Sequence, residues 1–109
     1  MAKKAAGQIR HFGFSYHGTP ELLEQVLDEH PEVEFVQIQL NYADWNNQVV
    51  QSGRLHEVLC RRGIPMIVME PVKGGMLSNL QPELEAMLRA VRPEASPASW
   101  ALRFAASLE

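Results

Sequence analysis

The sequence repeats one pattern three times: a short apolar segment followed by an amphipathic helix, at a spacing of roughly 30 residues. The first unit joins residues 8–18 to a predicted helix over 19–31, and the second joins residues 33–47 to a predicted helix over 48–63. The third unit begins at residues 64–77 and continues into two helices, each opened by a proline. This alternation is typical of a parallel sheet, so we expect an α/β fold.

Capping residues mark the expected helix ends. Thr19 is a suitable N-cap with Pro20 at the first helical position, and Ser96 precedes Pro97 in the same way. Gly63 is expected to end the second helix. The side chains expected to face the core are Leu22, Leu23, Val26 and Leu27 in the first helix, Val50, Leu55, Val58 and Leu59 in the second, and Trp100 and Phe104 in the last.

Composition narrows the class of protein. The 109 residues suit a single domain, and a net charge of −3 with no basic face argues against nucleic-acid binding. No apolar segment approaches the ~20 residues of a membrane span, and no secretory signal is recognisable. Because Cys60 is the only cysteine, we expect no disulfide framework and a cytoplasmic location. Cys60 and His56 are too few to hold a metal, and we expect Cys60 to pack as a small apolar residue.

Polar or aromatic residues collect where each predicted strand ends. The first strand ends near Ser15, the second near Asn41 and the third at Glu70. In parallel α/β folds this edge of the sheet is where ligands bind. Gln37, Gln39 and Asn41 also share one face of the second strand, and buried amides need hydrogen-bond partners. We expect Gln39 and Asn41 to form such bonds inside a barrel, with the apolar face of the strand covered by helices.

The segment 67–76, IVMEPVKGGM, ends a strand on an acid and a proline and continues into a lysine and two glycines. One interpretation is a strand followed by an ordinary turn, since Gly-Gly is a common loop signal. The other is a loop in which Gly74 and Gly75 let the backbone approach a ligand, with Lys73 as a point charge near a phosphate. Trp45 similarly either anchors its loop or borders a substrate pocket, and we favour the anchor.

Four segments, 7–18 (GQIRHFGFSYHG), 36–44 (VQIQLNYAD), 67–75 (IVMEPVKGG) and 96–107 (SPASWALRFAAS), resemble the aldo/keto reductases. They are most similar to bacterial members that can carry an iron–sulfur segment. The resemblance implies a partial (β/α)8 TIM barrel, with residues 1–109 as one domain matching the fifth to seventh strands of the family. About three parallel strands alternating with helices, plus two C-terminal helices, are expected.

The same resemblance implies one wall of a nicotinamide pocket, for NADP or NAD. Ser15 and Gln37 match the residues that bond the carboxamide, although Tyr16 stands where the family often has asparagine. Met69 matches a position where many members stack an aromatic ring on the nicotinamide. The loop beneath the pyrophosphate corresponds to Glu70, Pro71, Val72, Lys73, Gly74 and Gly75.

The implied activity is NAD(P)H-dependent reduction of a small-molecule carbonyl, or the reverse oxidation of an alcohol. In the family, the catalytic aspartate, tyrosine, lysine and histidine come from earlier strands. We therefore assign no catalytic residue and expect this chain to be inactive alone. The alternative is a non-catalytic barrel fragment that forms homo-oligomers through open sheet edges. A third interpretation is an unrelated phosphate-binding α/β domain that uses the loop at Lys73.

Overall fold

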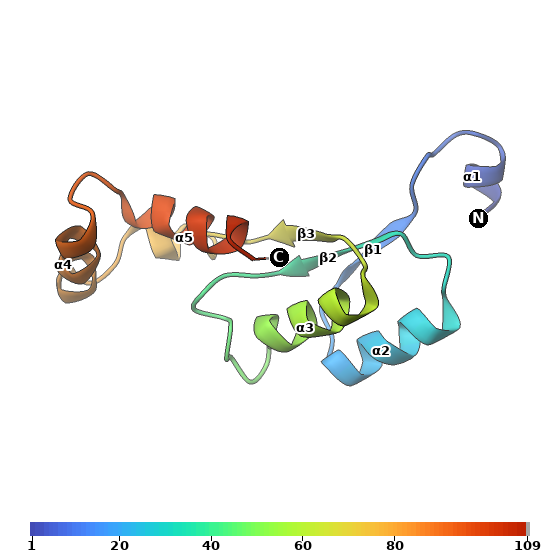
Figure 1. Cartoon of the computed structure of the whole chain (residues 1–109), viewed down its shortest axis with the longest axis horizontal. Helices are drawn as coiled ribbons and strands as arrows, with labels where there is room; N and C mark the ends of the chain where they lie inside the picture. The colour runs from blue at the N-terminus through green and yellow to red at the C-terminus, as the bar shows by residue number, and fades with distance from the viewer. Residues whose placement is uncertain (109) are drawn as a thin grey trace.

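The computed structural model describes residues 1–108, and its centre is a three-stranded parallel sheet (Figure 1). The strands β1 (Gly13–Tyr16), β2 (Phe35–Gln39) and β3 (Met66–Met69) lie in the order β1-β2-β3. Each strand is followed by helical structure. The strands pair in parallel, β1 with β2 and β2 with β3, so the parallel sheet predicted from the strand–helix alternation is confirmed. An open parallel sheet with helices after its strands is the expected form of a partial β/α barrel.

Five α-helices and one 3₁₀ helix accompany the strands in the described part of the chain. The helix that follows β1 begins and ends close to the predicted positions, the helix that follows β2 begins at Ser52 and not at the predicted residue 48, and the two C-terminal helices are confirmed. The short first helix and the 3₁₀ turn were not predicted. The bounds are α1 (Ala2–Ala5), α2 (Pro20–Glu29), α3 (Ser52–Arg62), η1 (Met76–Ser78), α4 (Pro82–Val91) and α5 (Pro97–Ala106).

The predicted caps are present. The Thr19 hydroxyl accepts a hydrogen bond from the Leu22 N–H at 3.3 Å, which satisfies one unpaired N–H of α2. Ser96 caps α5 in the same manner. Gly63 ends α3 with φ of +66°, a left-handed conformation that glycine adopts without strain. Because α3 begins only at Ser52, Val50 lies before the helix and the prediction that it belongs to the helical stripe was wrong.

One face of the sheet is covered by α2 and α3. Val36, Ile38 and Leu40 alternate along and beyond β2, and all three are fully buried against these helices. The core is completed by Leu23 and Leu27 of α2, Leu55, Val58 and Leu59 of α3, and Tyr16 and Val33. The prediction that Leu22 faces the core was wrong, since it is 49% exposed. Leu22 lies at the border of the α2 stripe, beyond the arc that the sheet can cover.

The opposite face of the sheet carries Ser15, Gln37 and Ile67 as a row of register partners across the three strands. Ser15 and Ile67 are exposed on this face. Near the start of β2, the Glu34 carboxylate accepts a hydrogen bond from the Phe12 N–H at 2.9 Å and pairs with Lys4. The bond from Lys4 and then that from Phe12 lower the pKa of Glu34 to about 2.

The C-terminal helices extend the molecule away from the sheet. Figure 1 shows α4 and α5 beyond the end where β2 and β3 finish. The radius of gyration is 16.6 Å, whereas a compact domain of about 100 residues has about 13 Å. No residue of α4 is buried. Among the described residues, no helix has the length and apolar character needed to cross a membrane.

Replacing Ile38 by alanine tests the helix-covered core. Ile38 is fully buried, so Ile38→Ala should lower the free energy of unfolding by about 2–5 kcal/mol in urea denaturation. Val49 is 84% exposed, so Val49→Ala should change the free energy of unfolding by less than about 0.5 kcal/mol. Equal effects of the two substitutions would contradict the assignment of this face as the core.

Candidate cofactor-binding site

Ser15 on β1, Gln37 on β2 and Met69 on β3 lie close together on the open face of the sheet, toward the carboxyl ends of the strands. We call this part of the sheet the carboxyl edge. Ser15 pairs directly with Gln37 in the parallel register of β1 and β2. The Gln37 amide Nε2 donates a hydrogen bond to the Met69 sulfur over 3.4 Å, which links β2 to the end of β3. Ser15 is exposed, whereas Gln37 and Met69 are half-buried. The predicted proximity of the three segments on parallel strands is thus present in the structure.

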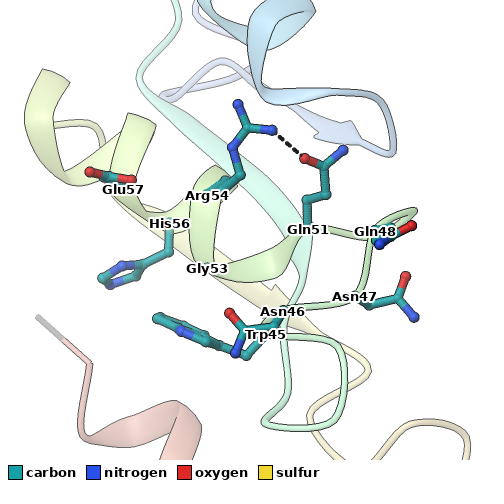
Figure 2. A pocket seen from close by; sticks show the side chains of 9 residues that line it. All are labelled: Trp45, Asn46, Asn47, Gln48, Gln51, Gly53, Arg54, His56 and Glu57. Atoms are coloured by element: carbon teal, nitrogen blue, oxygen red, sulfur yellow. Dashed lines mark hydrogen bonds between the residues drawn. The ribbon is translucent and has the colours of Figure 1, made fainter.

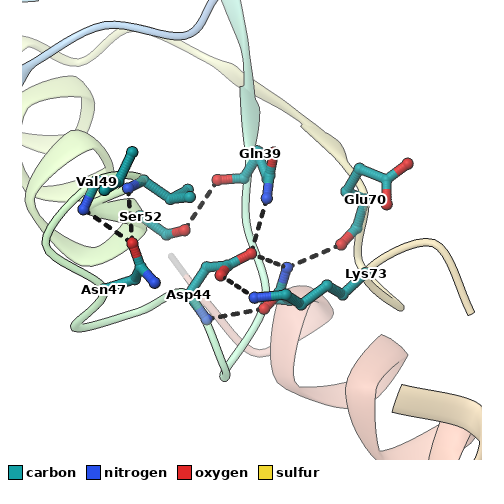
Figure 3. Close-up of polar contacts among 9 residues, drawn as sticks. Gln39, Asp44, Asn47, Val49, Ser52, Glu70 and Lys73 are labelled. Carbon is teal, nitrogen blue, oxygen red and sulfur yellow. Dashed lines mark hydrogen bonds and ion pairs between the residues drawn. The ribbon is translucent and has the colours of Figure 1, made fainter. Parts of the chain in front are cut away.

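A buried carboxylate lies beside this edge (Figure 3). Asp44 has no exposed surface, and its Oδ2 accepts hydrogen bonds of 2.8 Å each from the side-chain amides of Gln39 and Asn41. Its other oxygen, Oδ1, pairs with the Lys73 ammonium group from the loop after β3. We call Asp44, Gln39, Asn41 and Lys73 the Asp44 network.

Asn41 extends the Asp44 network to the end of β3. Its Nδ2 donates to the Glu70 carbonyl oxygen at 3.1 Å, and its Oδ1 accepts from the Asp44 N–H at 2.9 Å. The Ser52 hydroxyl donates to the Gln39 carbonyl oxygen at 2.9 Å, so the first residue of α3 is held as well. These bonds join the end of β2, the loop after β3 and the start of α3. The predicted hydrogen bonding of Gln39 and Asn41 is confirmed.

The predictions from sequence missed Asp44 as the centre of this arrangement. The available signal was the Asn-x-x-Asp spacing of Asn41 and Asp44 directly after a strand, where an asparagine side chain can bond the backbone three residues on. Burial raises the pKa of Asp44, but the hydrogen bonds from Lys73, Gln39 and Asn41 outweigh it. The pKa of Asp44 is therefore lowered, and the group is held as a carboxylate.

The loop after β3 has an unusual backbone. Glu70 and Lys73 have φ of +56° and +51°, and Gly74 and Gly75 follow with +60° and +90°. Left-handed conformations are uncommon for residues with a side chain, and the Lys73–Asp44 pair holds one of them in place. Gly74 and Gly75 are exposed, and within the described residues their N–H groups form none of the backbone hydrogen bonds of the loop.

A cavity of about 550 Å³ lies elsewhere, at the start of α3 (Figure 2). Trp45 borders it and contacts the rings of His56 and Phe104, each with a centroid distance of 5.4 Å. A Cβ atom on Gly53 would lie 2.8 Å from the Trp45 ring, so the glycine makes room for it. Trp45 therefore anchors its loop, as favoured from the sequence. The cavity is lined by Trp45, Asn46, Asn47, Gln48, Gln51, Gly53, Arg54, His56 and Glu57.

The prediction that Cys60 packs as a small apolar residue was wrong. Cys60 is exposed on α3, with its Sγ 3.4 Å from the His56 Nε2 one turn earlier. Cys60 follows the buried pair Val58 and Leu59 and so points away from the sheet. Within residues 1–108, no group of three or more His, Cys, Asp or Glu side chains is placed to hold a metal ion.

Comparison with known proteins gives the family to which this chain belongs. The family model described as "Aldo/keto reductase family" matches residues 2–109. No curated protein and no solved structure matches the chain. The chain belongs to the aldo/keto reductase family, a family of oxidoreductases whose members typically use NAD(P)H.

Removing the Asp44 carboxylate should destabilise the fold strongly. Asp44→Ala leaves Lys73 and two amides without their common partner, so the free energy of unfolding should fall by about 3–5 kcal/mol. Glu57 is an exposed acid on α3, and Glu57→Ala should change the free energy of unfolding by less than about 0.5 kcal/mol.

The contribution of Asp44 to the free energy of unfolding should decrease in acid. Folding lowers the pKa of Asp44, so its stabilising contribution is complete above the ordinary aspartate pKa of about 3.9. This contribution is lost as the pH falls through the lowered pKa of the folded protein. Urea denaturation at several pH values should show the difference between wild type and Asp44→Asn shrinking in acid. A difference that grows in acid would contradict the assigned ionisation.

Proposed function

We propose that the edge formed by Ser15, Gln37 and residues 69–75 binds the nicotinamide end of NADP or NAD during reduction of a small-molecule carbonyl or oxidation of an alcohol. Membership of the aldo/keto reductase family supports the reaction class. The observation that carries the assignment to this edge is the pairing of Ser15 with Gln37, whose amide in turn reaches Met69.

The side chains at this edge match the chemistry of a carboxamide. A carboxamide offers an oxygen that accepts and an NH₂ that donates, so its binding wall needs groups of both kinds. The Ser15 hydroxyl can do either, and the Gln37 amide carries both a donor and an acceptor. Among residues 1–108, the Gln37 NH₂ bonds a thioether sulfur at 3.4 Å, a weak acceptor that a ligand oxygen can replace.

The loop that follows suits the phosphate end of the same ligand. Gly74 and Gly75 are exposed and have no side chain to block approach, and N–H groups that form no backbone hydrogen bond among the described residues suit anionic oxygens. Lys73 is committed to Asp44, yet its side chain remains 30% exposed and has three N–H donors. We propose that Lys73 mainly positions the loop, and that backbone N–H groups contact the pyrophosphate.

The bound dinucleotide would supply the hydride, and this chain would bind and orient the dinucleotide. A carbonyl also needs a proton donor at its oxygen. The Tyr16 hydroxyl donates to the Thr19 carbonyl oxygen at 2.6 Å, and burial raises the pKa of both Tyr16 and Tyr42. We assign neither tyrosine as the acid, and we expect no carbonyl-dependent NADPH oxidation by this chain alone.

Titration of the protein with NADPH, monitored by the fluorescence of NADPH, tests the proposed binding edge. Ser15→Ala and Gln37→Ala should each raise the dissociation constant about five- to tenfold, since a neutral hydrogen bond contributes about 1 kcal/mol. Gln48→Ala is the control, because Gln48 is an exposed amide that lines the other cavity and should leave the affinity unchanged. Equal affinity of all three variants would contradict the assignment.

We also propose self-association through the open sheet. β1 and β3 each have only one neighbouring strand in the described part of the chain, so both present unpaired backbone edges. Ile67 is 46% exposed in the row of residues on the open face. An exposed isoleucine on an edge strand, together with two unpaired strand edges, favours pairing with another copy of the chain.

Sedimentation velocity of Ile67→Lys tests this second proposal. A lysine on the open face of β3 should shift the population toward smaller species, because charged residues on edge strands oppose pairing. Leu22→Lys is a matched control, since Leu22 is 49% exposed on α2, away from the sheet. An identical effect of the two substitutions would exclude the sheet as the interface.

A further inference from the structure

The carboxylate of Glu70 lies next to the carboxyl edge without a partner from the described chain. Glu70 is exposed, and among residues 1–108 its side chain forms no hydrogen bond or ion pair. Figure 3 shows the carboxylate pointing away from the Asp44 network, whereas the carbonyl oxygen of the same residue accepts from Asn41. Lys73, the lysine of this loop, is paired with Asp44. Glu70 therefore presents two acceptor oxygens to a ligand at this edge.

The backbone of Glu70 is held in an uncommon conformation. Its φ of +56° lies in the left-handed region, which residues with a side chain rarely adopt. Two donors hold its carbonyl oxygen, the Lys73 N–H at 3.0 Å and the Asn41 Nδ2 at 3.1 Å. Strained backbone of this kind collects at ligand-binding sites, where it is part of the pre-organisation of the site. The Asp44 network thus fixes the backbone that presents the Glu70 carboxylate.

The carboxylate lies over the glycine turn that follows it. Its Oε2 is 3.7 Å from the point where a Cβ atom on Gly74 would lie. Gly74 belongs to the turn whose N–H groups we propose for the pyrophosphate, and Met69 belongs to the part of the edge that we propose for the nicotinamide. Glu70 is therefore adjacent to both parts of the proposed site.

The order of these residues along the chain matches the order of groups along a dinucleotide. In NADP and NAD, one ribose joins the nicotinamide ring to the pyrophosphate. In the chain, Glu70 lies between Met69 and the turn at residues 73–75. A ribose carries neighbouring hydroxyl groups that donate hydrogen bonds, and a carboxylate has two oxygens that accept them. Acidic side chains bind ribose hydroxyl groups in other dinucleotide-binding folds.

We propose that the Glu70 carboxylate binds the hydroxyl groups of the ribose next to the nicotinamide. This role rests on the proposed function, since the ribose lies here only if Ser15 and Gln37 hold the carboxamide. Without hydroxyl groups as partners, a carboxylate beside a pyrophosphate would repel it. The two possibilities give opposite signs: loss of the Glu70 charge weakens cofactor binding if the carboxylate holds the ribose, and strengthens binding if the carboxylate only repels phosphate.

Titration with NADPH, monitored by its fluorescence, measures this sign. Glu70→Gln should raise the dissociation constant about tenfold, because the ribose loses a charged acceptor. Glu83→Gln is the matched control, since it removes the same charge from an exposed position on α4 and should leave the dissociation constant unchanged. A dissociation constant for Glu70→Gln that is lower than that of the wild type, or equal to it, would overturn the proposal.

An analogue of NADPH in which this ribose lacks both hydroxyl groups tests the contact itself. The wild-type chain should bind the analogue about tenfold less tightly than NADPH, a comparison that needs no variant. Glu70→Gln should bind the two ligands with dissociation constants within about twofold of each other. If Glu70 only supported the fold of the loop, Glu70→Gln would keep the full difference between the ligands, and that result would overturn the proposal.

The same titrations separate this role from the proposed function. If Ser15→Ala weakens NADPH binding and Glu70→Gln does not, the binding edge stands and the ribose contact is wrong. A wild-type chain that binds no NADPH would overturn both. The circular dichroism of Glu70→Gln should match that of the wild type, since glutamine already adopts a left-handed conformation at Gln51, with φ of +52°.

Discussion

The carboxylate of Asp44 is the interaction on which the arrangement of the strand ends depends. A charged group with no exposed surface is stable only when it is paired and hydrogen-bonded. Asp44 obtains these partners from Gln39 at the end of β2 and from Lys73 in the loop after β3. The same requirement that keeps the carboxylate ionised therefore fixes two segments that are 29 residues apart in the chain.

The two faces of the sheet have different roles. Apolar packing of α2 and α3 stabilises one face, so the other face does not have to be apolar and can carry Ser15, Gln37 and Met69. The Asp44 network lies directly beyond these residues and holds the loop that continues from them. The binding edge in our proposal thus has a rigid support from groups that need not contact the ligand.

Sequence alone predicted what depends on local chemistry or on the parallel arrangement. Thr19, Ser96 and Gly63 act on the next few residues, and their caps were confirmed. The proximity of Ser15 and Gln37 followed from parallel strands. The ion pair of Asp44 was not predictable, because no local pattern shows which distant lysine will reach a buried acid. The exposure of Cys60 was also missed, since a small thiol suits either side of an amphipathic helix.

The pKa of the Asp44 carboxyl group, followed by the ¹³Cγ chemical shift in an NMR titration, tests the central claim most directly. If the carboxylate is held by Lys73 and the two amides, it should titrate below the ordinary aspartate value of about 3.9, and Lys73→Met should move the pKa upward. A pKa at or above that value in the folded protein, unchanged by Lys73→Met, would show that the network does not hold the strand ends together.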